Sequence, residues 1–285
     1  MIRRRSGPSP KRRSRRSLRT LREPTRCVKR SRGQSPRDLY GRRREATPSG
    51  EVRGRLSVHL ITSRENEKLK LVRKLQDRSW RDKLGLFVAE GEDLVAAAQA
   101  AGIEPVELLV AGENVEQALL AEVATLAYPP RVIGVFRRGD LPVDSLPEVG
   151  LALWHVADPG NVGTLVRSAD ALGPAFVALS EGSADPTSPK ALRASMGALF
   201  RVPVVRFEAA PGRRVALVAH GTQPLDSLDL SGPMTFVLGA ERAGLPQDVL
   251  AACDEQATIP LARDAESLNV AAAGAIALYE RARRT

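Results

Sequence analysis

The sequence predicts an α/β protein whose C-terminal half contains a parallel sheet. Two observations support this fold class. Short apolar runs alternate with segments of helical periodicity along most of the chain. In the C-terminal half, three of the apolar runs end where glycine stands beside polar side chains. Because α/β proteins bind ligands outside the carboxyl ends of parallel strands, a ligand site is expected where these runs end.

The charge is divided unevenly along the 285 residues. Residues 1–57 hold 20 basic and 4 acidic side chains, so this segment carries +16 while the rest of the chain carries −6. So little apolar content beside so much charge predicts a disordered tail. The tail is interpreted as an arm that holds nucleic-acid phosphates, as a solvated extension without a role, or as the product of a start codon assigned too far upstream, with translation beginning near Val58.

Residues 58–138 are predicted to form a small α/β domain. A helix is expected over 63–77, where leucine and valine recur at helical spacing and Ser63 can cap the first turn. Strands and helices alternate after it. The expected strands are 84–89, 106–110 and 132–136, and the expected helices are one that ends at Ala101 and one over 115–124.

Residues 139–150 are predicted to be a linker, and 151–285 a second domain. The linker contains Pro142 and Pro147. The expected strands are 151–156, 176–179, 202–207, 215–219, 235–238 and one that ends at Ile259. The expected helices are 162–172, 189–199, a short one around Val249 and a final one over 269–283.

Three motifs follow the apolar runs of this second domain. They are ADPGNVGTLVR at 157–167, FVLGAERAGL at 236–245, and IPL at 259–261 followed by ESLNVA at 266–271. The first motif alone is typical of a strand-to-helix turn with Asn161 as N-cap, and Ser267 and Asn269 stand where capping residues also occur. The chain has no dinucleotide-binding fingerprint and no Walker lysine motif.

Together, in this order and spacing, the motifs resemble the three signature motifs of the SpoU (TrmH) family of RNA ribose 2′-O-methyltransferases, which belongs to the SPOUT superfamily. The resemblance covers residues 61–283. It implies a C-terminal SPOUT-type domain with a parallel sheet and a trefoil knot, which the periodicity itself does not reveal. It also implies S-adenosylmethionine as the cofactor and a homodimer formed through the final helix.

The resemblance assigns roles to residues of each motif. The catalytic residues that it implies are Asn161, Arg167, Glu241, Ser267 and Asn269. The cofactor-binding residues that it implies, largely through backbone groups, are Leu238, Gly239, Ile259, Pro260 and Leu268.

The segment from residue 61 to residue 91 resembles the start of the substrate-binding domain of many SpoU enzymes, which is similar to RNA-binding ribosomal proteins. Its basic residues are concentrated before residue 84, a pattern typical of a solvated helix face that here also favours RNA contact. Trp80 is interpreted either as a core residue or as a platform for a base. The expected RNA-binding residues are Arg64, Lys68, Lys70, Arg73 and Ser195.

The implied reaction transfers a methyl group from a sulfonium to a ribose hydroxyl. Attack by a developing alkoxide on a sulfonium merges opposite charges, so a dry pocket favours it. The family assigns activation of the hydroxyl to the equivalent of Arg167. Because arginine stays protonated, Arg167 can instead stabilise the alkoxide while an RNA phosphate or water takes the proton.

Ribosomal RNA is the expected substrate because of the N-terminal domain. The alternatives are transfer RNA methylation and a non-catalytic RNA-binding protein of the same fold. The two cysteines and three histidines are scattered, so no metal site is expected. No apolar run is long enough for a membrane helix, and the expected compartment is the cytoplasm.

Overall fold

The computed structural model of the protein describes residues 60–143, 145–220, 223–262 and 266–284. The basic segment 1–57 lies outside the described residues, so its predicted disorder stays a prediction. The described residues form one compact unit. In the part of the chain that the structure describes, no helix is long and apolar enough to cross a membrane.

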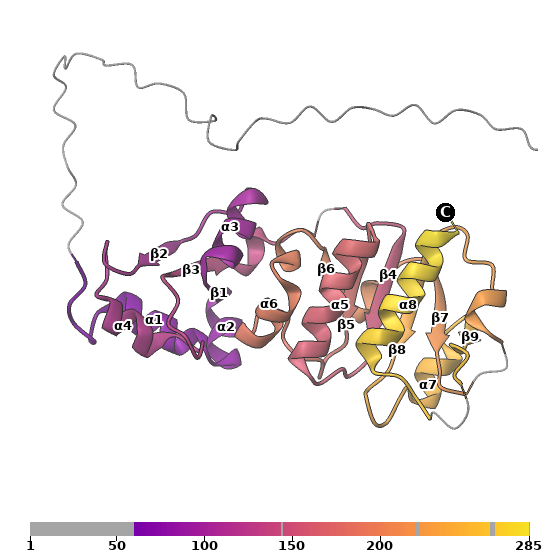
Figure 1. Ribbon diagram of the computed structural model, residues 1–285. Coiled ribbons are helices and arrows are strands. Elements are labelled where there is room, and N and C mark those ends of the chain that lie inside the picture. Colours follow the sequence, from indigo (N-terminus) through magenta and orange to yellow (C-terminus); the bar gives the residue numbers. More distant parts are fainter. Residues whose placement is uncertain (1–59, 144, 221–222, 263–265, 285) are drawn as a thin grey trace, which may run out of the picture. The chain divides into compact units, whose positions relative to one another are not determined.

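The first sheet is antiparallel and has three strands in the order β1-β3-β2 (Figure 1). Successive residues of a strand point to opposite faces. Val88 and Ile133 therefore pack with α1 and α4 on one face, and Phe87 and Phe136 pack with α3 on the other. The elements are α1 (Glu67–Leu75), β1 (Leu86–Glu90), α3 (Glu92–Ala100), β2 (Glu107–Val110), α4 (Gln117–Val123) and β3 (Val132–Arg137).

Two local predictions for this region need correction. Asn66, not Ser63, caps α1, because its side chain accepts a hydrogen bond from the backbone N–H of Lys68. The structure also contains a helix that the sequence did not predict, α2 (Arg78–Leu84). Its arginine- and lysine-rich sequence shows no apolar stripe, and its buried residue is Arg81.

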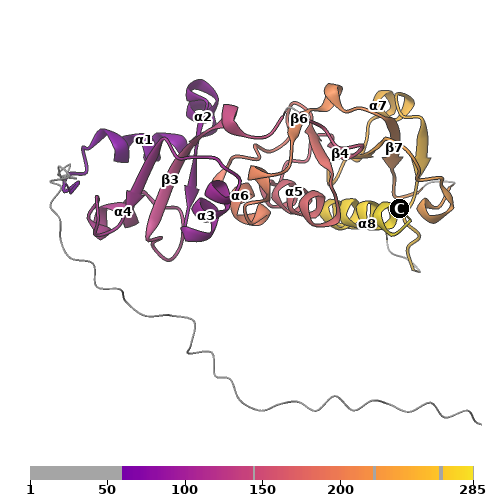
Figure 2. The ribbon, with the colours of Figure 1, turned by 90° about the horizontal axis from the view of Figure 1, so that it is seen from above.

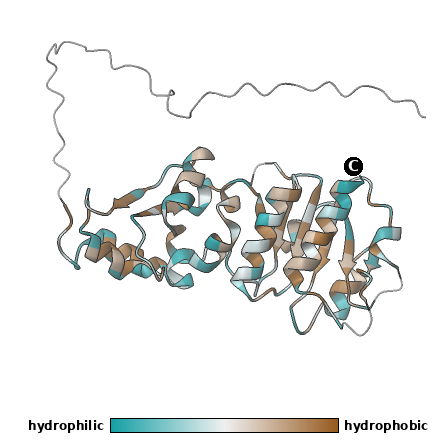
Figure 3. Cartoon of the chain, in the orientation of Figure 1, coloured by the Kyte–Doolittle hydropathy of each residue, from teal (hydrophilic) through white to brown (hydrophobic). Residues whose placement is uncertain are grey.

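The second sheet is parallel throughout and has six strands in the order β6-β5-β4-β8-β7-β9, which confirms the predicted parallel α/β class. Its strands are β4 (Val149–Leu153), β5 (Phe176–Leu179), β6 (Val204–Arg206), β7 (Arg213–Leu217), β8 (Met234–Leu238) and β9 (Glu255–Ala257). The strands β5, β4 and β8 are apolar along most of their length (Figure 3).

Helices cover both faces of this sheet. Figure 2 shows α5 (Pro159–Leu172) and α8 (Val270–Arg283) along one face and α7 (Gln247–Ala251) on the other. Glycine permits the close contact of α5 with α8, because a Cβ on Gly274 would lie 2.3 Å from Leu165 Cδ2. The strand-to-helix turns of β4 and β8 therefore stand beside the first turn of α8, where the site lies.

The helix predicted over 189–199 is shorter in the structure. It ends as α6 (Pro189–Ser195), because Met196 and Gly197 adopt left-handed backbone conformations with φ of 51° and 78°. Glycine is needed at the second position, where a Cβ would lie 2.5 Å from the Cβ of Ala97. The side chain of Met196 is thereby left 56% exposed.

Candidate active site

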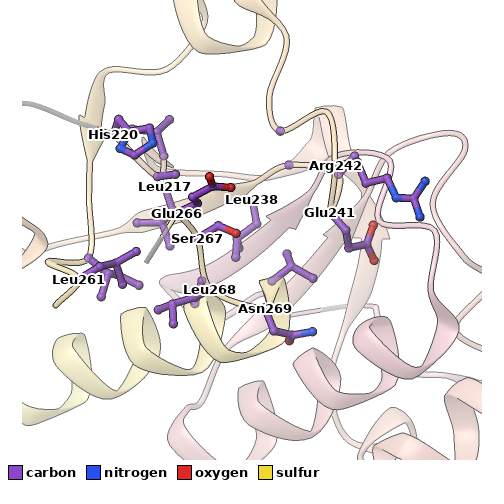
Figure 4. Close-up of a pocket in the computed structure, with 18 residues that line it drawn as sticks. Leu217, His220, Leu238, Glu241, Arg242, Leu261, Glu266, Ser267, Leu268 and Asn269 are labelled. Atoms are coloured by element: carbon purple, nitrogen blue, oxygen red, sulfur yellow. The ribbon is translucent and has the colours of Figure 1, made fainter. Parts of the chain in front are cut away.

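A pocket of about 640 Å³ opens at the carboxyl ends of β7 and β8 and above the first turn of α8. Figure 4 shows its two sides. Leu217, His220 and Leu261 lie on one side, and Glu241 and Asn269 lie on the other. This position agrees with the general rule for open parallel sheets.

A line of hydrogen bonds connects the three motifs at one edge of this pocket. The Asn269 Nδ2 donates to Asn161 Oδ1 at 3.2 Å, and the Asn161 Nδ2 donates to Glu241 Oε1 at 2.9 Å. The Asn269 Oδ1 accepts from the backbone N–H of Ala271 at 2.8 Å, so Asn269 also caps α8. Because each amide has a defined donor side and acceptor side here, the line sets the orientation of both asparagines.

Glu241 is held as a carboxylate by its hydrogen-bond donors. Partial burial acts to raise its pKa, but the amide of Asn161 and the backbone N–H groups of Glu241, Asp158 and Ala157 outweigh burial and leave the pKa below its usual value. The last two groups lie 3.4 and 3.5 Å from the carboxylate oxygens. The pocket edge therefore carries a negative charge at neutral pH.

The first turn of α5 is capped beside this edge. The Asp158 carboxylate, and not Asn161, accepts from the backbone N–H of Gly160 at 2.6 Å, which corrects the capping alternative considered above. Lys190 on α6 donates to the same carboxylate at 3.0 Å. The pKa of Asp158 is lowered, first by this lysine and then by the Gly160 N–H. Asn161 is thus free of capping and available to Glu241.

The loop between β8 and α7 has a geometry that only glycine permits. A Cβ on Gly239 would lie 2.2 Å from the backbone carbon of Gly244, and Gly244 itself has a φ of 66°. Ala240 and Gly244 exchange backbone hydrogen bonds at 3.1 and 2.9 Å, which closes the loop tightly at the pocket wall. Backbone groups of the loop therefore form the wall where a bulkier residue would fill the space.

Four of the five predicted cofactor-binding residues line the pocket, namely Leu238, Gly239, Ile259 and Leu268. The fifth, Pro260, is exposed and stands between two lining residues without lining the pocket itself. Leu268 remains 40% exposed, so an apolar surface is open at this point. Leucine side chains together with backbone N–H and C=O groups suit an uncharged planar ring, and the acidic side chains suit a cationic ligand.

The predicted catalytic residues are brought together in part. Asn161, Glu241 and Asn269 are joined by hydrogen bonds, and Ser267 lines the same pocket. Arg167 does not line the pocket. It is exposed on α5, and among the described residues it has no hydrogen-bond or ion-pair partner. It lies on the same helix as Asn161, six positions further along the chain.

The predicted RNA-binding residues are mostly engaged within the protein. Arg64 pairs with Glu122, Lys68 pairs with Glu107, and Lys70 pairs with Glu65 and Glu67. Arg73 donates to the carbonyl of Arg64 at 2.9 Å. Ser195 is 1% exposed, and its hydroxyl donates to the carbonyl of Leu192. Their contact with RNA stays a prediction.

Sequence reasoning missed one side of the pocket. Leu217 and His220 stand at and just beyond the carboxyl end of β7. The signal was present, because a strand was predicted over 215–219 and the residues after a parallel strand lie at the edge where ligands bind. Glu266, which precedes the predicted Ser267, also lines the pocket. Among the described residues no cluster of histidine, cysteine and acidic side chains is suited to hold a metal ion.

Comparisons with known proteins agree with this geometry. Residues 148–279 match the SpoU rRNA Methylase family, and residues 66–135 match the MRM3-like substrate binding domain. The chain is 32% identical over 261 residues to an uncharacterized tRNA/rRNA methyltransferase of Synechocystis, covering 79% of this chain and 93% of that protein.

Two further relatives have more specific descriptions. One is the 23S rRNA (guanosine(2553)-2′-O)-methyltransferase RlmP of Bacillus subtilis, which is 33% identical and covers 77% of this chain and 97% of its own. The other is the crystal structure of an AdoMet-bound rRNA methyltransferase from Sinorhizobium meliloti, with a TM-score of 0.71, 31% identity and coverage of 79% and 97%. The chain therefore belongs to the SpoU family of RNA methyltransferases.

Proposed function

We propose that this enzyme transfers the methyl group of S-adenosylmethionine to the 2′-hydroxyl of a ribose in ribosomal RNA. The observation that carries the proposal is the hydrogen-bonded line from Asn269 through Asn161 to Glu241 at the edge of the pocket. Two of the relatives support it, since one is a 23S rRNA (guanosine-2′-O)-methyltransferase and the other is an rRNA methyltransferase with AdoMet bound.

The pocket fits this cofactor. S-adenosylmethionine supplies a methyl group on a cationic sulfur, and the leucines and backbone groups around Gly239 would hold its adenosine. The ionised Glu241 orients Asn161, and Asn269 fixes the opposite side of the same amide. The two asparagines and Ser267 would then position the ribose, so that its hydroxyl approaches in one orientation.

Arg167 would act on the hydroxyl oxygen. Its guanidinium has no ion-pair partner among the described residues, so its positive charge is available to the developing alkoxide. The proton leaves to water or to a phosphate oxygen of the RNA. Exclusion of bulk water from the pocket strengthens the attraction between the alkoxide and the sulfonium as their charges merge.

We further propose the domain division, the knot, the dimer and the compartment that the family resemblance implies. Residues 58–138 would form the domain that binds the RNA substrate, and residues 139–150 would link it to the catalytic domain. Residues 151–285 would form that catalytic domain and contain the trefoil knot. Ile276 and Tyr279 on α8 are 38% and 56% exposed, which suits a homodimer through this helix. A cytoplasmic location follows from a ribosomal RNA substrate.

Methyl transfer to defined RNA tests the proposed function. Protein, S-adenosylmethionine with a labelled methyl group and unmodified transcripts of ribosomal and transfer RNA should give label in ribosomal RNA only. Ribose methylation blocks alkaline cleavage at the next phosphate, so a gap in the hydrolysis ladder locates the nucleotide. Label in transfer RNA alone would show that transfer RNA is the substrate instead. RNA binding without any label would favour the non-catalytic alternative.

Arg167→Ala is the informative variant in this assay. It should bind S-adenosylmethionine as the unchanged protein does and lose most transfer, because the guanidinium is assigned to the ribose oxygen and not to the cofactor. Arg206→Ala is a control, since it removes another exposed arginine of the same domain, at the end of β6. Near-normal turnover by the Arg167 variant would remove that residue from the mechanism.

A further inference from the structure

The basic side chains between residues 64 and 83 differ in whether carboxylates neutralise them. Most of them have such partners, as the pairs of Arg64, Lys68 and Lys70 show. Lys74 and Lys83 have none among the described residues. Both are exposed, so they carry uncompensated positive charge on this surface, as does Arg73, whose guanidinium donates to the carbonyl of Arg64.

These two lysines meet at one aromatic side chain. The Nζ of Lys74 lies 5.1 Å from the centroid of the Trp80 ring, and the Nζ of Lys83 lies 4.9 Å from it. Trp80 is only partly buried, and its indole N–H has no acceptor among the described residues. The ring therefore contacts two exposed cations and is only partly buried, which does not fit a core residue; its use as a platform for a base stays a prediction.

The helix that carries Trp80 is firmly anchored. The next residue, Arg81, is 3% exposed, and its guanidinium donates to Asp185 at 2.7 Å and to the carbonyls of Leu75 and Gln76 at 2.9 and 2.8 Å. Gly85 ends the helix in a left-handed conformation. The indole thus stands on a preorganised support, while the two lysine side chains beside it are exposed and have no carboxylate partner among the described residues.

We propose that Trp80, Lys74 and Lys83 form a subsite for one unpaired nucleotide of the RNA substrate. The base stacks on the indole in place of a lysine ammonium, and the displaced lysine binds the adjacent phosphate. Every base has an aromatic face, so stacking needs no particular base. A duplex keeps its base faces within its own stack and cannot use the ring. The inference rests on RNA being the substrate in the proposed function.

Binding of a labelled, short single-stranded oligoadenylate to the full chain tests the subsite. Trp80→Leu should weaken binding about tenfold, within the range for one base stacked on an aromatic residue, and Trp80→Phe should keep most of the affinity. Lys83→Gln should weaken binding and flatten its salt dependence. Arg131→Gln removes an exposed arginine elsewhere on the surface and should change neither.

Two additional measurements separate the subsite from folding and from catalysis. All variants should bind S-adenosylmethionine normally, and with ribosomal RNA the Trp80→Leu variant should show a raised KM at an unchanged kcat. A duplex of the same length should bind equally well to Trp80→Leu and to the unchanged protein.

The inference is overturned if Trp80→Leu binds the oligoadenylate normally, or if it loses duplex binding to the same extent. If Trp80→Leu weakens binding only to an acidic protein partner and not to RNA, the surface is assigned to protein binding instead. Absence of ribose methylation by the unchanged protein would refute the proposed function, while a Trp80-dependent affinity for single strands would still support the subsite.

Discussion

Replacing Asp185 by asparagine should destabilise the protein by about 3 kcal/mol, because it leaves a buried arginine without its anion. The side chains of Arg81 and Asp185 are 4% and 6% exposed and lie 2.7 Å apart. Arg138 donates to the same carboxylate at 2.7 Å, and Thr187 donates to it from its backbone and its hydroxyl. Loss of one partner of a buried pair costs about 3–5 kcal/mol. The lower end applies here, since Arg81 keeps two carbonyl acceptors.

Thermal or urea unfolding measures this cost. At about 2–4 °C per kcal/mol for a chain of this size, Asp185→Asn should lower Tm by about 10 °C. Adding Arg81→Met to Asp185→Asn should recover part of the loss, because it removes the buried charge that lacks its anion, while the introduced asparagine still offers an amide oxygen to Thr187. A loss below about 1 kcal/mol would place the pair with ordinary surface ion pairs and refute the reasoning.

The pH dependence of the same pair has a defined sign. Burial acts to raise the pKa of Asp185, but Thr187, Arg138 and Arg81 outweigh it and lower the pKa below the usual value. A lowered folded-state pKa contributes stability that is complete above the unfolded-state pKa and is lost as the pH falls through the folded-state value. The stability difference between the unchanged protein and Asp185→Asn should therefore shrink below about pH 4.

Three further changes act on the site and on assembly. Gly239→Ala should abolish S-adenosylmethionine binding in calorimetry, because its Cβ would meet the Gly244 backbone at 2.2 Å; ordinary affinity would contradict this. Glu241→Gln should slow turnover about tenfold to a hundredfold by weakening a charged hydrogen bond to Asn161. The unchanged enzyme should lose activity as the pH falls through the lowered pKa of Glu241. If Glu241→Gln loses activity over the same acidic pH range, protonation of Glu241 does not cause that loss. Ala275→Glu should yield inactive monomers by light scattering, whereas an active monomer of the unchanged protein would disprove the dimer.

The sequence predicted the second sheet well, because its strands are short apolar runs that end in glycine and polar residues. All six expected strands are present, and the helix that begins after Asn269 starts where the capping asparagine predicts. The three motifs were also sufficient to identify the family. Local patterns carried this information, since strand burial and helix capping depend on neighbouring residues.

Other features required residues that are distant in the chain. The helix α2 escaped prediction because its buried side chain is Arg81, whose burial depends on Asp185 104 positions later. Ser195, expected at the RNA surface, is buried by the fold. The pairing of most basic side chains between residues 64 and 83 with carboxylates, which leaves Lys74 and Lys83 beside Trp80, is likewise invisible in the charge pattern alone.

The sequence by itself determined which segments become strands and helices and where glycine and polar residues would gather. Only the tertiary structure decided that β4 lies between β5 and β8, although β8 follows it by about eighty residues. Strand order depends on packing between distant segments, and the periodicity of the sequence does not indicate it. That order brings Glu241 to Asn161, 80 positions apart, and Asn161 to Asn269, 108 positions apart, within hydrogen-bond distance.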